Sequence, residues 1–172
     1  MTKNYFMQLA DYNTWANDIV HSWFDQLTDE QWQQAIVSSF PSLSATALHT
    51  AGAETVWLDR LNKMAEPRWL VKTLNGEKKG VQDAWKASST GLKTFIANFD
   101  ETQLAETVSF KRPDGNTYQL KFHEIFSHVF NHSTYHRGQI VTMLRQVGFT
   151  NVHSIDMSTY FWKPPKSPKG GT

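Results

Sequence analysis

A long apolar stripe near the C-terminal end of the chain constrains the fold more than any other feature. Over residues 122–147, apolar side chains recur at three- and four-residue intervals, the period of an α-helix that buries one face. Gly148 follows, where a left-handed residue would end such a helix. The stripe consists of Phe122, Ile125, Phe126, Val129, Ile140, Met143, Leu144 and Val147. A helix this long must pack its stripe against other elements.

Three further segments show the same helical period and provide those partners. They cover residues 3–27, a segment that begins at Ser42 or Ser44 and ends within 62–65, and residues 81–99. Thr28 and Gln31 have the spacing of a capping box, which predicts a short helical turn around Trp32. Four amphipathic helices with modest loops predict an all-α protein, an up-down four-helix bundle.

One segment departs from the helical period. Residues 107–110 and 117–120 are β-prone, and the Lys-Arg-Pro-Asp-Gly-Asn turn sequence lies between them. This pattern predicts a small β-hairpin inserted before the last long helix.

Length and composition limit the classes of protein. The 172 residues suit one domain, predicted over 1–162, with a disordered tail over 163–172. The formal net charge of +1 argues against nucleic acid as a partner. No run approaches the roughly 20 apolar residues needed to cross a membrane, and no signal peptide is recognisable, so we expect a cytoplasmic protein. With no cysteine, a metal site must use histidine and carboxylate ligands.

Two histidines interrupt the last apolar stripe. His132 and His136 occupy positions where apolar residues are expected, and side chains four residues apart lie on one face of a helix. They could be core histidines bonded to the backbone or to water. Two buried imidazoles in one stripe are nevertheless hard to satisfy without a shared partner. We therefore predict a divalent metal ion between them.

A third ligand should come from a facing helix. His49 is the best placed candidate, because alanines and Gly52 surround it and leave room for an ion. His128, one turn before His132, is either a fourth ligand or, as we favour, a residue that supports the ligands. Of the remaining histidines, His21 and His153 lack a second ligand at suitable spacing, and we expect His123, at the helix start, to be a surface or capping residue.

Several polar residues are candidates for catalysis or support. Asn13 and Asn17 interrupt the first apolar stripe, either as buried amides or as groups that orient a substrate; Tyr12 and Tyr135 could supply hydroxyl groups. Glu54 is a conceivable general base, although a helical glutamate is usually solvated or salt-bridged. For Arg137 and Gln139 we expect roles in helix packing or a dimer contact.

Three stretches resemble the DinB/YfiT-like family. They are residues 12–17, residues 49–57, and the segment from His128 to Gln139. The resemblance implies a four-helix bundle, commonly a homodimer, with a divalent ion on residues that correspond here to His49, His132 and His136. Relatives include transferases and isomerases that use low-molecular-weight thiols, and proteins assigned as metal-dependent hydrolases. The family name refers to induction by DNA damage, which concerns regulation.

Two hypotheses of function follow. The first is a metal-dependent enzyme, a thiol S-transferase or a hydrolase, that acts on a small molecule through an open three-histidine site. The second is a stress-response protein that binds a metal or a ligand without turnover. Imidazole ligands suit several ions, and we expect zinc or nickel before iron, manganese or cobalt.

Overall fold

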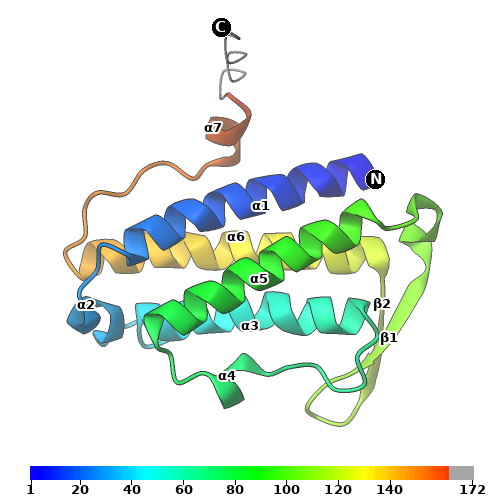
Figure 1. Cartoon of the computed structure of the whole chain (residues 1–172), viewed down its shortest axis with the longest axis horizontal. Helices are drawn as coiled ribbons and strands as arrows, with labels where there is room; N and C mark the ends of the chain where they lie inside the picture. The colour runs from blue at the N-terminus through cyan, green and yellow to red at the C-terminus, as the bar shows by residue number, and fades with distance from the viewer. Residues whose placement is uncertain (163–172) are drawn as a thin grey trace, which may run out of the picture.

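The computed structural model describes residues 1–162, and the tail expected over residues 163–172 lies outside the described residues. Four long helices dominate the molecule (Figure 1): α1 (Lys3–Phe24), α3 (Leu43–Leu61), α5 (Lys78–Ala97) and α6 (Phe122–Gln146). The predicted all-α four-helix bundle with a hairpin is therefore confirmed. Gly148 has the left-handed conformation expected beyond the last helix, with φ 83°.

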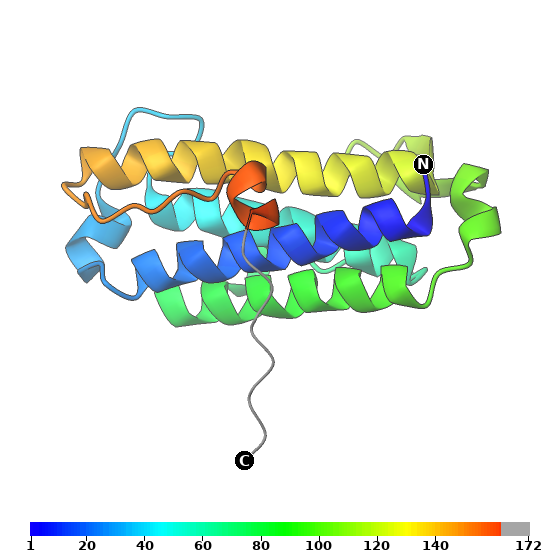
Figure 2. The ribbon, with the colours of Figure 1, turned by 90° about the horizontal axis from the view of Figure 1, so that it is seen from above.

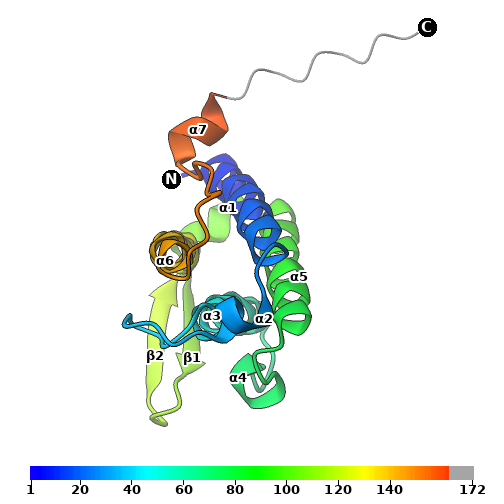
Figure 3. The same ribbon diagram turned by 90° about the vertical axis from the view of Figure 1, so that its left-hand side faces the viewer.

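The helices pack in the order α1, α5, α3 and α6 around the bundle, as the end-on view shows (Figure 3). The chain directions depart from a simple up-down order at one connection. Gly76, just before α5, lies against Ser44 at the start of α3, and Ser89 on α5 contacts Glu54 farther along α3. Helices α3 and α5 are therefore parallel. On its other side, α3 packs against α6 and α5 packs against α1, and both of these pairs are antiparallel.

The segment over residues 62–77 explains this direction, because it returns along the length of the bundle before α5 begins. It contains the short helix α4 (Leu70–Thr73). The turn expected around Trp32 is α2 (Asp29–Gln33), and its Thr28–Gln31 capping box is formed. A short final helix, α7 (Met157–Phe161), lies outside the bundle over α1 (Figure 2).

The predicted hairpin is present between α5 and α6, after the 3-10 helix η1 (Glu101–Ala105). Strands β1 (Thr107–Lys111) and β2 (Thr117–Lys121) pair antiparallel, with Val108 opposite Leu120. The turn places Gly115 at φ 83°, a conformation that glycine adopts at little cost. Strand β2 leads directly into α6, so the hairpin lies beside the first turns of that helix.

A layer of buried polar side chains divides the core in two. One apolar cluster includes Trp23, Trp85 and Leu144, and the other includes Phe6, Leu92 and Phe126. Between them, all four long helices contribute to what we call the polar layer: Asn13, Asn17, Glu54, Ser88, Ser89, Ser133 and Arg137.

Among the described residues, no helix is long and apolar enough to span a membrane.

Candidate metal centre

Three histidines from two antiparallel helices converge beside the polar layer. His49 is on α3, and His132 and His136 are one turn apart on α6; nitrogen atoms of the three rings all lie within 4.8 Å of one another. The His132 Nε2 atom is 3.1 Å from His49 Nε2 and 3.2 Å from His136 Nε2. Among the described residues this is the one such group. We call these residues the histidine triad.

The separations between the nitrogens fit a shared ion. Two imidazole nitrogens that each lie about 2.0–2.1 Å from a tetrahedral ion are about 3.3 Å from each other. The two contacts of His132 Nε2, at 3.1 and 3.2 Å, are close to that value. Hydrogen bonds among the rings satisfy the triad poorly, because His132 Nε2 faces two imidazoles at once and its buried Nδ1 has no partner.

Gln139 determines which nitrogen of His136 faces the other histidines. Its side-chain amide donates to Ser39 Oγ at 2.9 Å, which turns Oε1 toward His136 Nδ1 at 2.7 Å. His136 must then donate from Nδ1, which leaves the Nε2 lone pair directed at the triad. Metal-ligating histidines are usually held in this way. For Gln139 we expected a role in helix packing or in a dimer contact, and its hydrogen bond with His136 was not foreseen.

The surroundings keep the imidazoles in the neutral form that binds metals. Burial, followed by the neighbouring charge of His136, lowers the pKa of His49 to about 4. Burial and the same neighbour lower the pKa of His132 to about 3. Phe40 contributes to this shielding, since its ring stacks on His49 with a centroid separation of 4.2 Å. At neutral pH the triad therefore presents uncharged rings.

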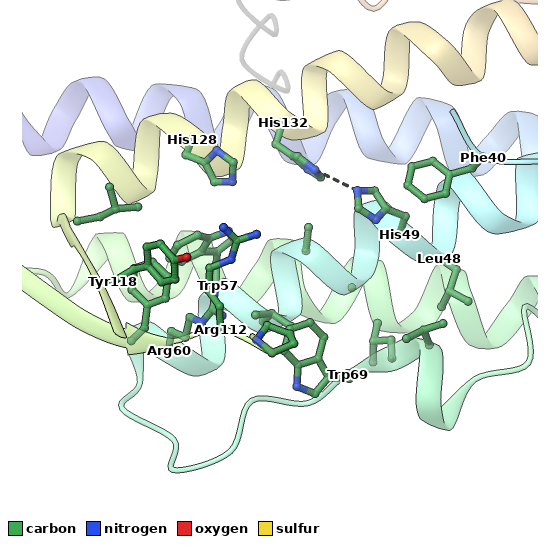
Figure 4. A pocket seen from close by; sticks show the side chains of 18 of the residues that line it. Phe40, Leu48, His49, Trp57, Arg60, Trp69, Arg112, Tyr118, His128 and His132 are labelled. Carbon is green, nitrogen blue, oxygen red and sulfur yellow. Dashed lines mark hydrogen bonds between the residues drawn. The ribbon is translucent and has the colours of Figure 1, made fainter. Parts of the chain in front are cut away.

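A cavity of about 770 Å³ adjoins the triad and extends along α3 toward the hairpin. His49 and His132 lie at one part of its wall and His128 farther along, as Figure 4 shows. The rest of the wall is mainly apolar and aromatic: Phe40, Leu48, Val56, Trp57, Trp69, Leu70, Val71, Phe110, Tyr118 and Leu120. A cavity of this size can accommodate a small organic molecule.

His128 lies beside the triad without joining it. Its ring centroid is 5.6 Å from that of His132, and it packs edge-on against Trp57. The other three histidines, His21, His123 and His153, also lie outside the triad, as expected. Of these, His21 packs against Trp85 in a different part of the core.

Asn13 and Asn17 do not line this cavity. Both amides donate to Glu54 Oε1, at 3.0 and 3.4 Å, and both amide oxygens accept from Arg137 Nη1. The structure therefore places them as buried amides that link α1 to α3 and α6, the first of the two interpretations of their positions.

Glu54 corrects an expectation, because it is neither solvated nor salt-bridged at the surface. Its side chain is fully buried. Oxygen Oε1 also accepts from Trp85 Nε1 at 3.2 Å and Ser133 Oγ at 2.8 Å, while Oε2 accepts from Ser89 Oγ at 2.6 Å and Ser88 Oγ at 3.3 Å. With every lone pair engaged, this carboxylate has no capacity left to act as a base in the cavity.

The two tyrosines are also away from the cavity wall. The Tyr12 hydroxyl donates to the Ile155 carbonyl at 2.9 Å, and its ring lies under the Arg137 guanidinium. Tyr135 is 60% exposed and packs edge-on against the ring of His136.

The cavity wall also contains three residues that the sequence did not single out: Phe40, Arg60 and Arg112. For Phe40 a signal was available, because it is an isolated aromatic residue in a polar loop.

The fold and the site together define a four-helix-bundle protein with a histidine triad that could hold a metal ion. The model of the DinB family matches residues 1–166, and the chain belongs to that family. It is 26% identical over 155 residues to Protein DinB of Bacillus subtilis (strain 168), covering 86% of this chain and 89% of that protein.

The fold has a counterpart among solved structures. The crystal structure of a DinB-like protein from Bacillus cereus ATCC 10987 superimposes with a TM-score of 0.67 at 23% sequence identity. The match covers 87% of this chain and 95% of that one. Similarity at this level of identity supports the shared bundle architecture.

Proposed function

We propose that this protein is a metal-dependent enzyme that acts on a small organic molecule, with His49, His132 and His136 as the ligands of a divalent ion. The observation that carries the proposal is the convergence of three neutral imidazoles beside an apolar cavity, whose wall includes His49 and His132. A divalent ion held by these three imidazoles would keep open positions and would supply Lewis acidity there, which lowers the pKa of a thiol, or that of water toward about 7.

Within this proposal, the cavity favours thiol transfer over hydrolysis. None of the described residues that line it is Asp or Glu, and Glu54 is occupied within the polar layer. Thiol transfer would need a group that accepts the thiol proton, because the ion would only raise the acidity of the thiol. The thiolate would then form a carbon–sulfur bond as the electrophilic carbon loses its leaving group. His128, on the same wall, is placed to accept that proton and pass it to solvent.

The metal is tested by elemental analysis of protein purified without a nickel column. We expect about one divalent ion per chain in the wild type and little in His49→Ala and His132→Ala. His153→Ala is the matched control, because His153 is exposed and outside the triad. Equal metal content in all four proteins would rule out the triad as the site. The same measurement identifies the ion, for which zinc and nickel lead.

The reaction is tested with a panel of low-molecular-weight thiols and 1-chloro-2,4-dinitrobenzene, whose chloride is displaced as the carbon–sulfur bond forms. We expect conjugation that disappears with a chelator and returns with Zn²⁺ or Ni²⁺. Hydrolysis of p-nitrophenyl acetate without thiol transfer would favour the hydrolase. A bound ion without turnover in either assay would support the second hypothesis, a non-catalytic metal- or ligand-binding stress-response protein.

The oligomeric state belongs to the same proposal. The family resemblance implies a homodimer, and size-exclusion chromatography with light scattering would show whether the mass is twice 19.8 kDa.

A further inference from the structure

Two arginines line the cavity without a carboxylate partner. Arg60 is near the end of α3, and Arg112 begins the turn of the hairpin. Among residues 1–162, no carboxylate oxygen lies within 4.0 Å of either guanidinium. Arg60 Nη2 donates to the carbonyl of Lys111, the residue before Arg112, so both arginines lie at the hairpin. Burial and then the charge of Arg112 lower the pKa of Arg60. We call them the arginine pair.

The acidic residues that neighbour the two arginines in the sequence have other partners. Asp59, next to Arg60 in the chain, is buried and bonded through both oxygens to Arg68, with a shortest contact of 2.7 Å. Asp114, in the hairpin turn, accepts from the Tyr118 hydroxyl at 2.9 Å and from the Asn116 backbone. The charge of Arg112 contributes to lowering the pKa of Asp114, but the two side chains form no ion pair. The positive charge at this end of the cavity is therefore not neutralised by an ion pair.

Aromatic rings hold the arginine pair in place. The Arg60 guanidinium lies 4.5 Å from the Phe110 ring centroid and 4.8 Å from that of Trp57, and its Nη2 donates to the Lys111 carbonyl. The Arg112 guanidinium lies 5.2 Å from the Tyr118 ring centroid. Stacking fixes the plane of a guanidinium and leaves its edge free to donate hydrogen bonds. The buried Nε of Arg60 has no partner.

The arginine pair and the histidine triad lie at separate parts of one wall. Arg60 follows His49 by eleven residues on the same helix, which corresponds to about 16 Å along its axis. Figure 4 shows Arg60, Arg112, Trp57 and Tyr118 grouped on one side of His49 and His132, with His128 above them. Apolar side chains line the space between, so a ligand that reaches both ends needs an apolar middle.

We propose that the cavity binds an elongated organic anion, whose carboxylate or similar group is held by Arg60 and Arg112 while its apolar body extends toward the histidine triad. The anion neutralises two unpaired cations and accepts the free guanidinium N–H groups. This inference rests on the proposed function for the identity of the reacting end, since the substrate's reactive group would lie at the triad. The anion subsite itself does not require a metal.

The test compares 6-phenylhexanoate with 6-phenylhexan-1-ol, which share the apolar body and differ in charge. Binding is measured by isothermal titration calorimetry to protein stripped of metal with a chelator. We expect the carboxylate to bind about tenfold more tightly than the alcohol, and the preference to weaken with added salt. Stripping the metal ensures that the carboxylate is not simply ligating an ion.

Variants separate the arginine pair from general charge effects. Arg112→Gln and Arg60→Gln should each reduce the preference for the carboxylate to about twofold or less, whereas Arg145→Gln, which removes an exposed charge near the end of α6, should leave it unchanged. Arg112→Gln is informative even if Arg60→Gln disturbs the packing of Trp57.

Equal affinity for the two compounds, no binding of either at millimolar concentration, or a preference that survives Arg112→Gln would each overturn the anion subsite. If His132→Ala loses its metal but keeps the preference, both proposals stand. If elemental analysis finds no metal while the preference persists, only the proposed enzyme function fails.

Discussion

Two polar clusters lie side by side in the same bundle, and they differ in how fully their hydrogen bonds are satisfied. In the polar layer, the two oxygens of Glu54 accept from six side chains on three other helices. In the histidine triad, His132 Nδ1 is buried without a partner and three ring nitrogens face one another. Both clusters use α3 and α6, and Ser133 directly follows His132 in the chain.

The difference indicates which cluster is structural and which is built for a ligand. A buried charge persists only when hydrogen bonds and an opposite charge compensate it. Glu54 meets that condition with groups of the chain, because six side chains donate to it and Asn13 and Asn17 link it to Arg137. The triad does not meet it with chain groups, and it opens onto a cavity. A buried polar cluster whose hydrogen bonds the chain itself does not satisfy indicates a binding site for an ion or a substrate.

The largest effect should follow from removing the carboxylate of the polar layer. Glu54→Ala leaves Arg137 buried without the negative charge that its network contains, and it removes the acceptor that six buried side chains share. We expect the free energy of unfolding of metal-free protein, from urea denaturation, to fall by about 3–5 kcal/mol.

Two controls delimit this prediction. Asp83→Ala removes an exposed carboxylate paired with Lys79, and it should change stability by less than about 0.5 kcal/mol. His132→Ala should have a clearly smaller effect than Glu54→Ala, because no satisfied network depends on it. If the histidine variant proved the more destabilising of the two, the contrast between the clusters would be incorrect.

Much of the fold could be predicted from the sequence, for reasons visible in particular segments. The helical period identified the four long helices, and Pro-Asp-Gly identified the hairpin turn, because both signals are local. The parallel direction of α3 and α5 was missed, since residues 62–77 read as a loop and nothing in their composition shows which way they run. That direction depends on tertiary contacts such as that between Ser44 and Gly76.

The three histidines of the candidate site were predictable from the sequence, whereas the burial of Glu54 and the position of the two arginines were not. His132 and His136 could be paired because one helix carries both, while His49 was preferred for its small neighbours and by resemblance. The burial of Glu54 was missed because its partners come from three other helices, and no single one of these segments shows that its serine, asparagine or tryptophan side chains meet at one carboxylate. Arg60 and Arg112 were missed for a similar reason: the sequence shows the charges but not that Asp59 is occupied by Arg68.

The next largest effect concerns the contact that orients one ligand of the triad. Gln139→Ala removes the acceptor of His136 Nδ1, so the ring is free to rotate and to adopt either tautomer. We expect the affinity for Zn²⁺, measured by competition with a chromogenic chelator, to fall about 10- to 100-fold with the fold intact. Gln34→Ala, on an exposed residue, is the matched control. Unchanged affinity would mean that Gln139 does not support the site.

The smallest effect should be the response of the metal-free protein to pH. The folded-state pKa values of His49 and His132, about 4 and about 3, lie below the 6.5 of an unfolded histidine. The unfolded chain therefore binds more protons below pH 6.5, so stability is fully present above that pH and declines as the pH falls toward 4. Each group contributes at most about 1.4 kcal/mol per pH unit, and less here because the rings are partly exposed.

Urea denaturation between pH 7 and pH 5 in the presence of a chelator would measure this decline, which His132→Ala should make shallower and His153→Ala should not. Saturating Zn²⁺ should oppose the decline, because the ion binds the same neutral imidazoles that protons would occupy. The polar layer offers the contrast within the same experiment, since its Glu54 carboxylate is satisfied by the chain and has no need of the ion. A slope unaffected by His132→Ala would place the pH response elsewhere in the molecule, with the half-buried ring of His21, whose pKa burial also lowers, as the first alternative.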